Sequence, residues 1–599
     1  MSELKTIGKM FRSVVEKYPE KPALCRKESG AWKPITYREL HNTVLTFSKS
    51  LHLLGLRHGD RLAIMLGNSP EWVIADLATI SIGAADVPLY GTISDEQAKH
   101  ILNDSGAKII LIRGDDQVAK LRNIIGSLPE VQVVITVDEG VGAFGSVRTI
   151  SFASALKLGK EADASAESKV KEAVEKTSPN DLASIIYTSG TTGMPKGVML
   201  SHGNITSNLE AIYKAVDILN SDVHLSFLPL SHVFERTCGY YCLIGVGATI
   251  NYAESMETIA DNIKEIHPTV VISVPRLFEK MLAKIKDKVA NGPAVRQKLF
   301  YWALGVGVRM TDPDRKESDS LWLQLQFKLA SKLVFSKLQE AFGGKIRYFI
   351  SGGAALNKDV ANFFRSIGIK VVEGYGLTET SPVIAVNPPD GIRLGTVGKV
   401  LSNLEMKMEE DGELCVRGPS ISKGYFNNFE ATKEAFDSDG WFHTGDIIEL
   451  SDDGYVTIVD RKKDIIVMSN GKNVAPLTLE SKLVGDDYIA QITVVGNNRK
   501  FMAALIVPNF DKLKRFANDQ GIANDDNSKL ILSPKVVALY QQRIDEHMKD
   551  FARFEQVKKF TLLAHEFTEK GGELTPSLKV KRKVIDKKYA EIIDKMYAE

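Results

Sequence analysis

The chain has 599 residues, of which 44% are hydrophobic and 25% are charged. These values are ordinary for globular proteins, and the length is enough for several structural units. The net charge is only +1, so the chain has no global field that would favour binding to nucleic acid.

Four cysteines are scattered along the chain, at positions 25, 238, 242 and 415. They are too few for a disulfide framework, and no second cysteine pair is present to complete a zinc site. We therefore expect buried free thiols in a reducing, cytoplasmic location. No apolar run reaches the roughly 18 residues of a membrane-spanning helix, and the first residues lack the apolar core of a signal peptide. The sequence predicts a soluble protein, with peripheral contact at a membrane left open.

Short β-branched runs alternate with helical stretches along most of the chain. We predict strands at residues 108–113, 131–137, 269–274 and 346–350. Ile259, Ile263 and Ile266 fall on one face of a helix that Pro268 ends. Such alternation predicts an α/β fold of layered sheets and helices.

The most informative segment follows a polar stretch at 161–180 and a predicted strand at 182–186. It has the sequence YTSGTTGMPKGV and supplies Thr188, Ser189, Gly190, Thr191, Thr192, Gly193 and Lys196. Glycines let backbone N–H groups point at an anion, hydroxyls add donors, and the lysine adds a mobile positive charge. The spacing differs from that of a Walker A loop. We predict a phosphate-binding loop; the alternative is a turn without a ligand.

This segment resembles the phosphate loop of the adenylate-forming superfamily. That group includes acyl-CoA synthetases, aryl-CoA ligases, nonribosomal peptide adenylation domains and beetle luciferases. Further motifs follow in the family's order, so the resemblance covers most of the chain. It implies a large N-terminal AMP-binding domain of layered αβ subdomains, residues 1–461, and a small mobile α+β C-terminal domain, residues 462–599.

The segment FLPLSHVFERTCG (227–239) borders the acyl pocket in this family, which places His232 and Val233 there. Neither an H-E-x-x-H zinc pattern nor a G-x-S-x-G elbow is present. We therefore expect His232 to be a hydrogen-bonded wall residue, with acid–base chemistry as the alternative. Members that activate amino acids carry an aspartate in this segment, and its absence indicates an uncharged acyl tail. The string HVFER resembles long-chain synthetases, although an aromatic gate known in one branch falls at Arg236.

The span between residues 274–276 and 351–353 is longer than in small-acid ligases of the family. We expect it to house or cover a deep apolar tunnel. Within it, a solvated loop at 311–320 precedes an apolar helical stripe, formed by Leu323, Phe327, Ala330, Val334 and Leu338. We predict that this stripe faces the core; the alternative is a basic amphipathic helix that lies on a membrane.

Two strings, SGGAAL (351–356) and EGYGLTET (373–380), follow predicted strands, and open α/β sheets bind ligands at strand ends. The resemblance implies that they bind ATP or AMP. It places adenine between Gly353, Ala354 and Tyr375, and the α-phosphate at Thr378. Glu379 and Thr188 are implied to hold Mg²⁺, which prefers hard oxygen ligands. The same strings add Glu373, Gly374 and Gly376 to the nucleotide-binding set.

Three later segments complete the motif set. DGWFHTGDI (439–447) and DRKKD (460–464) are similar to a signature of fatty acyl-CoA synthetases, with Phe442 in place of the more usual leucine. A carboxylate accepts several hydrogen bonds, and the resemblance implies that Asp446 binds the ribose together with Arg461. It also implies a hinge at Lys463 and a coenzyme A path at Gly471.

The last motif, ELTPSLKVKRKVI (573–585), resembles the one that carries the family's adenylation lysine. The position is Lys579, although Leu578 replaces the usual glycine and Lys581 remains the alternative. The predicted catalytic set is therefore Lys579, Lys196, Glu379 and Thr188. A hinge of a few residues would let the C-terminal domain change orientation between two half-reactions.

The resemblance implies a long-chain fatty acid:CoA ligase that forms an acyl-adenylate from ATP and fatty acid and then transfers the acyl group to coenzyme A. The alternatives are a ligase for aryl or branched acids, transfer to a carrier protein, and a non-catalytic acyl- or nucleotide-binding scaffold. Intact Lys196, Glu379, Asp446, Arg461 and Lys579 argue against the scaffold.

Overall fold

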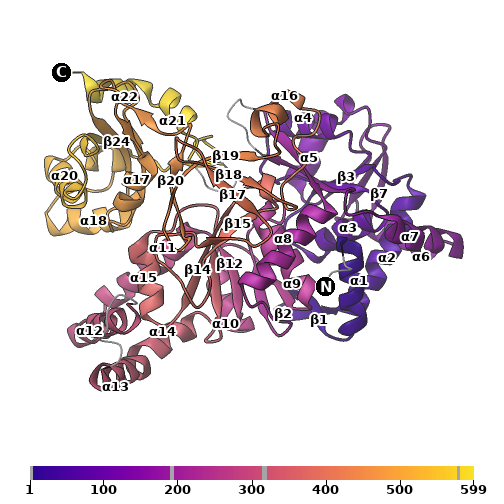
Figure 1. Ribbon diagram of the computed structural model, residues 1–599, viewed down its shortest axis with the longest axis horizontal. Helices are drawn as coiled ribbons and strands as arrows, with labels where there is room; N and C mark the ends of the chain where they lie inside the picture. Colours follow the sequence, from indigo (N-terminus) through magenta and orange to yellow (C-terminus); the bar gives the residue numbers. More distant parts are fainter. Residues whose placement is uncertain (1–4, 189–193, 313–319, 576–579, 599) are drawn as a thin grey trace.

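The structure is a computed structural model that describes residues 5–188, 194–312, 320–575 and 580–598. Two large sheets dominate its N-terminal part, and Figure 1 shows helices packed around them. The predicted α/β fold is confirmed. In the described ranges no helix is both long and apolar enough to cross a membrane.

The first large sheet has seven strands, of which six are parallel and β9 is antiparallel. In spatial order they are β7 (Arg148–Ser151), β6 (Val133–Thr136), β5 (Ile109–Ile112), β3 (Arg61–Met65), β4 (Ala85–Pro88), β8 (Leu182–Thr188) and β9 (Lys196–Ser201). Its helices include α4 (Asp95–Ser105), α5 (Asp115–Ile124), α6 (Phe152–Lys160) and α7 (Ala164–Lys176). The polar stretch at 161–180 therefore contains a helix, which buries Ala166 and Val170.

The second large sheet has nine strands with a parallel centre and antiparallel edges. In spatial order they are β16 (Lys399–Val400), β15 (Val383–Val386), β14 (Lys370–Gly376), β13 (Tyr348–Ser351), β12 (Val270–Ser273), β10 (Val223–Ser226), β11 (Thr249–Tyr252), β1 (Pro22–Glu28) and β2 (Ala31–Thr36). The strand expected at 346–350 thus begins two residues later. The helix α10 (Ile259–Ile266) ends at His267, directly before Pro268, as predicted.

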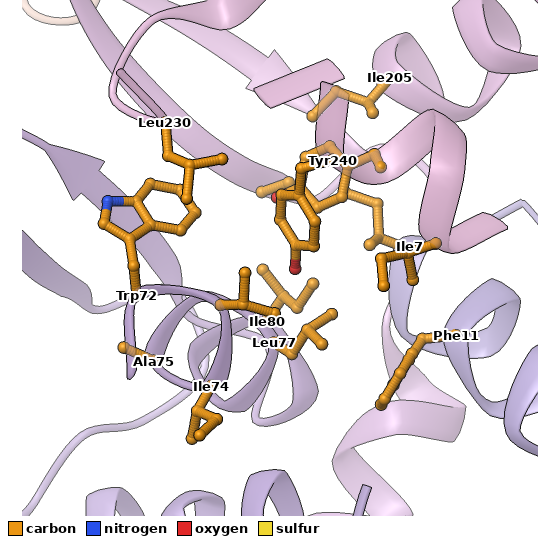
Figure 2. Close-up of a cluster of buried hydrophobic side chains, with 14 of the residues drawn as sticks. Ile7, Phe11, Trp72, Ile74, Ala75, Leu77, Ile80, Ile205, Leu230 and Tyr240 are labelled. Carbon is orange, nitrogen blue, oxygen red and sulfur yellow. The ribbon is translucent and has the colours of Figure 1, made fainter. Parts of the chain in front are cut away.

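A hydrophobic core joins the two sheets through helices between them. They are α1 (Ile7–Lys17), α2 (Tyr37–Leu53), α3 (Pro70–Ser81), α8 (His202–Ala215), a π-helix at Glu235–Tyr241 and α9 (Cys242–Val246). Figure 2 shows part of this core, where Trp72 meets Tyr240 edge to face at a ring-centroid distance of 6.1 Å. Helix α8 starts at a capping box, since the side chains of Ser201 and Asn204 each accept the other's backbone N–H.

The described residues of the long span before β13 form four α-helices and one π-helix. They are α11 (Pro275–Ala290), α12 (Ala294–Thr311), α13 (Leu321–Ala330), which a π-helix at Ser331–Phe335 continues, and α14 (Ser336–Ala341). The predicted stripe faces the core: Leu323 and Ala330 are buried, and Phe327, Val334 and Leu338 are partly buried against the same cluster. Helix α15 (Lys358–Ser366) packs there too.

The rest of the chain forms smaller sheets. A four-stranded one contains β17 (Glu405–Met408), β18 (Glu413–Arg417), β19 (Phe442–Leu450) and β20 (Val456–Arg461), with α16 (Phe429–Ala435) beside it. The C-terminal part has β21 (Ile466–Val467), β22 (Asn473–Val474), α17 (Pro476–Val484), β23 (Ile489–Val495), β24 (Met502–Pro508), α18 (Phe510–Asp519), α19 (Asn527–Leu530), α20 (Pro534–Met548), β25 (Val557–Leu562), α21 (Arg582–Lys588) and α22 (Ala590–Tyr597).

The C-terminal part has cores of its own. Two hydrophobic clusters contain only residues from 466 onward. Polar contacts join this part to the rest: Asn357 donates a hydrogen bond to the Ser481 carbonyl at 2.8 Å, and Lys512 pairs with Asp287 at 2.8 Å. Polar contacts between separate cores are typical of domains that move relative to one another.

Candidate active site

A cavity of about 1360 Å³ lies where the two sheets, the four-stranded sheet and the C-terminal part meet. Most of the predicted site residues line it: Thr188, Lys196, His232, Val233, Gly353, Ala354, Glu373, Gly374, Tyr375, Gly376, Thr378, Glu379, Asp446, Arg461 and Lys463. Gly471 lies on an exposed turn and is not among the lining residues. Ser189, Gly190, Thr191, Thr192, Gly193 and Lys579 lie outside the described residues.

The predicted phosphate loop connects β8 to β9. These strands form an antiparallel hairpin in which Thr188 lies directly opposite Lys196. The Lys196 ammonium lies over the ring of Tyr425, 5.4 Å from its centroid, and the Tyr425 hydroxyl donates a hydrogen bond to Glu379 at 2.7 Å. One tyrosine thus links the lysine of the hairpin to the predicted metal carboxylate. Sequence reasoning missed Tyr425, whose only signal is an aromatic residue in the turn-rich string GYFNN.

The residues present fit the magnesium ion that the family implies. Thr188 and Glu379 both line the cavity and offer a hydroxyl and a carboxylate, which are hard oxygen ligands. The hydrogen bond from Tyr425 fixes one carboxylate oxygen of Glu379. The backbone of Glu379 is held as well, because its carbonyl accepts the Ser422 N–H at 2.7 Å.

Asp446 lies at the centre of a second polar cluster. Tyr375 donates its hydroxyl hydrogen to Asp446 Oδ2 at 2.5 Å, and Arg461 Nε donates to Oδ1 at 2.8 Å. Residues 446 and 461 are direct partners across β19 and β20, so the sheet register creates this ion pair. Burial opposes the charge on Arg461, but the neighbouring Asp446 carboxylate raises its pKa above the ordinary value. The result is a preorganised carboxylate at the cavity wall.

Backbone geometry shapes the predicted adenine site. Gly353 has φ +82°, in the left-handed region that favours glycine. A Cβ atom at Gly376 would lie 1.7 Å from the Pro382 carbonyl oxygen, so only glycine fits. Glu373 is 6% exposed, and burial raises its pKa to about 8. Its Oε1 has no hydrogen-bond partner among the described residues.

The far end of the cavity is apolar. It is lined by Ile212 of α8, by Val216 and Ile218 after that helix, by Val233 and Phe234 directly before the π-helix, by Cys238 in it, and by Cys242 of α9. Both thiols are buried, and burial raises the pKa of Cys242 to about 12, so it stays neutral. All four cysteines are free and buried, as predicted. This end suits an uncharged tail.

The described residues of the long span between 276 and 350 do not house the cavity, and that the span covers a tunnel stays a prediction. Of the described residues from 277 to 349, only Glu279 lines it. The physical reason is that the stripe on α13 packs on α12 and belongs to a buried cluster that also contains residues of α15 and β13.

The charged residues of the HVFER string do not join His232 in a catalytic group. Glu235 belongs to a buried group of polar side chains. Its Oε1 accepts a hydrogen bond from the Ser226 hydroxyl at 2.6 Å and lies 3.0 Å from Nε2 of His224. Arg236 is 1% exposed and pairs with Asp76 and Asp86. His232 lines the cavity, and its Nδ1 accepts the Phe234 N–H at 3.1 Å. Its predicted role as a wall residue remains a prediction.

The C-terminal part also reaches the cavity. Thr575 and Val580, which flank the segment 576–579, both line it, as does Lys581. Leu574 and Val580 form an antiparallel bridge, and the Lys581 N–H donates to the Glu573 carbonyl at 2.8 Å. The described residues on either side of 576–579 therefore lie at this cavity.

Comparison with known families agrees with this architecture. Residues 11–426 match the AMP-binding enzyme family, and residues 463–599 match the AMP-binding enzyme C-terminal domain. The chain therefore belongs to the AMP-binding enzyme family, and the resemblance drawn from its motifs is confirmed.

Two relatives and one solved structure are similar to nearly the whole chain. The chain is 34% identical over 572 residues to the long-chain-fatty-acid–CoA ligase FadD15 of Mycobacterium bovis, covering 95% of this chain and 93% of the relative. It is 32% identical to the long-chain-fatty-acid–CoA ligase ACSBG2 of Gallus gallus, covering 99% and 81%. A solved structure of the adenylation domain of a carboxylate reductase from Mycobacterium chelonae shares the fold, with a TM-score of 0.75, 23% identity, and coverage of 99% and 91%.

Proposed function

We propose that this protein is a long-chain fatty acid:CoA ligase that works through an acyl-adenylate. The observation that carries the proposal is one cavity that joins a polar, phosphate-suited end at Thr188, Lys196 and Glu379 to an apolar end along α8 and the π-helix. The named relatives that cover nearly the whole chain support the substrate class.

The first half-reaction attaches the fatty acid carboxylate to the α-phosphorus of ATP, and diphosphate leaves. Negative charge builds on phosphate oxygens, so positioned cations lower the barrier. Lys196 is one such cation, held beside Tyr425. Asp446, fixed by Tyr375 and Arg461, orients the ribose hydroxyls. Magnesium, when bound at Thr188 and Glu379, supplies further positive charge to the phosphates.

The second half-reaction admits the thiol of coenzyme A, which attacks the acyl carbon and releases AMP. We assign Lys579 to the first step, because its described neighbours Thr575 and Val580 line the cavity. We propose that residues 462–599 then reorient about Lys463 and that Gly471 reaches the path of the thiol. Separate hydrophobic cores on either side of residue 461 support this division.

A cytoplasmic location with peripheral membrane contact belongs to the same proposal. Four buried free thiols suit a reducing compartment. The membrane contact is consistent with a substrate that partitions into lipid.

The decisive experiment incubates the protein with ATP, Mg²⁺, coenzyme A and saturated fatty acids of graded length. We expect AMP release and acyl-CoA formation, with the highest kcat/KM for long chains. Parallel reactions with benzoate and with an acyl carrier protein in place of coenzyme A test the aryl-acid and carrier-protein alternatives. Absence of AMP release with every fatty acid would refute the proposal.

A further inference from the structure

Helices α12 and α13 project from the body of the molecule, at the lower left of Figure 1. Their inner sides explain why they fold: Phe300, Ala303 and Val306 of α12 pack with Leu323 and Ala330 of α13 in a buried cluster. This packing uses one side of α13 only. The opposite side contributes nothing to the core.

That opposite side is apolar. We call it the outer face, and it consists of Leu321, Trp322, Leu325, Leu329 and Leu333. Leu321 is 83% exposed and Trp322 67%. The spacing i, i+4, i+8, i+12 from Leu321 places the leucines along one helical stripe. Tyr301 and Val295 of α12 are also exposed.

Such a concentration is unusual for this chain. Seven of the nineteen large hydrophobic side chains exposed in the described parts lie between 295 and 333. Contiguous exposed apolar surface marks an interaction site far more often than scattered single residues do. The outer face therefore requires a partner.

Basic residues predominate in the sequence around the outer face. Residues 294–311 and 320–339 contain Arg296, Lys298, Arg309, Lys328, Lys332 and Lys337 and no aspartate or glutamate, and the segment 312–319 between them adds two basic and four acidic residues. The span 294–339 therefore has eight basic and four acidic residues, a net charge of +4, against +1 for the whole chain. Lys328 and Lys332 are exposed between the leucines of the outer face. A partner surface should therefore be both apolar and anionic.

We propose that the outer face of α13 inserts into the surface of an anionic lipid bilayer. Lysine is depleted at protein–protein interfaces, whereas basic amphipathic helices with exposed Trp and Leu are typical of bilayer surfaces. Anionic headgroups attract each Lys or Arg near them. The proposal rests on the proposed function, because it assumes a long-chain fatty acid as substrate. Such an acid dissolves in the bilayer, and docking there brings the enzyme to it.

The test is co-sedimentation of the full chain with vesicles of phosphatidylcholine, either alone or with roughly 30% phosphatidylglycerol. We expect binding to the anionic vesicles that weakens with salt. A variant with Trp322→Ser, Leu325→Ser and Leu329→Ser should bind at least about tenfold more weakly, as should Lys328→Glu with Lys332→Glu, because two basic contacts become repulsive. The matched control is Leu532→Ser with Val537→Ser, two exposed apolar residues in the C-terminal part.

The outcomes separate this inference from the proposed function. Activity on a short, water-soluble fatty acid should be unchanged in the outer-face variants, while activity on a long-chain acid supplied in anionic vesicles should fall. Absence of vesicle binding by the unaltered chain, or equal binding by variants and control, would overturn the inference even if the enzyme is active. If the outer-face variants change only the oligomeric state in sedimentation velocity, the face contacts a second copy and the inference is wrong.

Discussion

Two clusters in this molecule share an arginine, an aspartate and a tyrosine and have opposite surroundings. Arg236, Asp76 and Tyr241 form one, and Arg461, Asp446 and Tyr375 form the other. In both, a guanidinium and a phenol hydroxyl hold a carboxylate. The side chains of Arg236 and Asp76 are at most 1% exposed, whereas the Arg461 side chain is 39% exposed and lines the cavity.

The buried cluster joins separate elements. Arg236 on the π-helix donates to Asp86 of β4 and to Ser184 of β8 at 2.7 Å, and it pairs with Asp76 of α3. Two carboxylates face one guanidinium, and burial raises the pKa of Asp76 well above its usual range. A proton on Asp76 makes the cluster neutral. This cluster ties the seven-stranded sheet to α3 and the π-helix, and its ion pairs are at most 1% exposed.

The comparison teaches that similar groups form a sealed structural contact where water is excluded and stay accessible where a cavity reaches them. A buried charge without its partner is costly, whereas an accessible charge can exchange a partner for a ligand. Three substitutions test this difference and a fourth tests the proposed adenylation lysine, beginning with the one of largest expected effect.

Arg236→Ala should lower the free energy of unfolding by about 3–5 kcal/mol, because it leaves buried Asp86 without its counter-ion. Urea denaturation followed by circular dichroism measures the change. Arg461→Ala is the matched control and should cost no more than about 1.5 kcal/mol, since its side chain is partly exposed. Equal losses in the two variants would break the comparison.

Lys579→Ala should slow adenylate formation by about 10²–10³, the typical effect of removing one group that stabilises transition-state charge. Thioester formation from supplied acyl-adenylate should change little. Rapid-quench measurement of each half-reaction gives both rates. Lys581→Ala is the control, because Lys581 lines the same cavity. A larger adenylation loss in the control would assign the role to Lys581 instead.

Asp446→Asn should weaken ATP binding by about 2 kcal/mol, roughly thirtyfold in KM, because a charged acceptor for the ribose becomes a neutral amide. Stability should change by less than about 1 kcal/mol, since the side chain keeps its shape. Asp76→Asn should leave the KM for ATP unchanged, because Asp76 lies in the buried cluster, where burial raises the pKa of its carboxyl. If Asp76→Asn raised that KM as much, the buried cluster would not be purely structural.

Glu373→Gln tests a residue that shares features of both clusters, since it is buried and also lines the cavity. Burial raises its folded pKa to about 8, above the unfolded value near 4.5. Between about pH 4.5 and pH 8 the folded state therefore keeps a proton on Glu373 that the unfolded state has lost. The stability that this proton contributes is lost as pH rises through the folded pKa. The slope is at most about 1.4 kcal/mol per pH unit for one group.

The measurement for Glu373→Gln is the free energy of unfolding at several pH values from 5 to 8. The variant should show a flatter decline than the unaltered chain, because glutamine cannot lose a proton. Identical slopes would show that Glu373 keeps its charge in the folded protein.

The sequence by itself determined the fold class and the order of the motifs, and it predicted most residues of the proposed nucleotide site. This was possible because glycine, hydroxyl and lysine residues that directly follow a predicted strand indicate a phosphate-binding loop from neighbouring residues alone. Thr188 and Lys196 were predicted from this pattern, and Glu379, Asp446 and Arg461 from the resemblance to the family; all five line one cavity.

Only the tertiary structure decided what each charged or apolar side chain faces. Tyr425 joins Lys196 to Glu379 from 46 residues beyond Glu379, a contact without a local signal. Arg236 and His232 share one string, yet one enters a sealed ion cluster and the other a cavity wall. Helix α13 is apolar on two sides, and its sequence cannot tell the packed side from the exposed one. Burial depends on segments that are distant in the chain, and for that reason local patterns do not contain it.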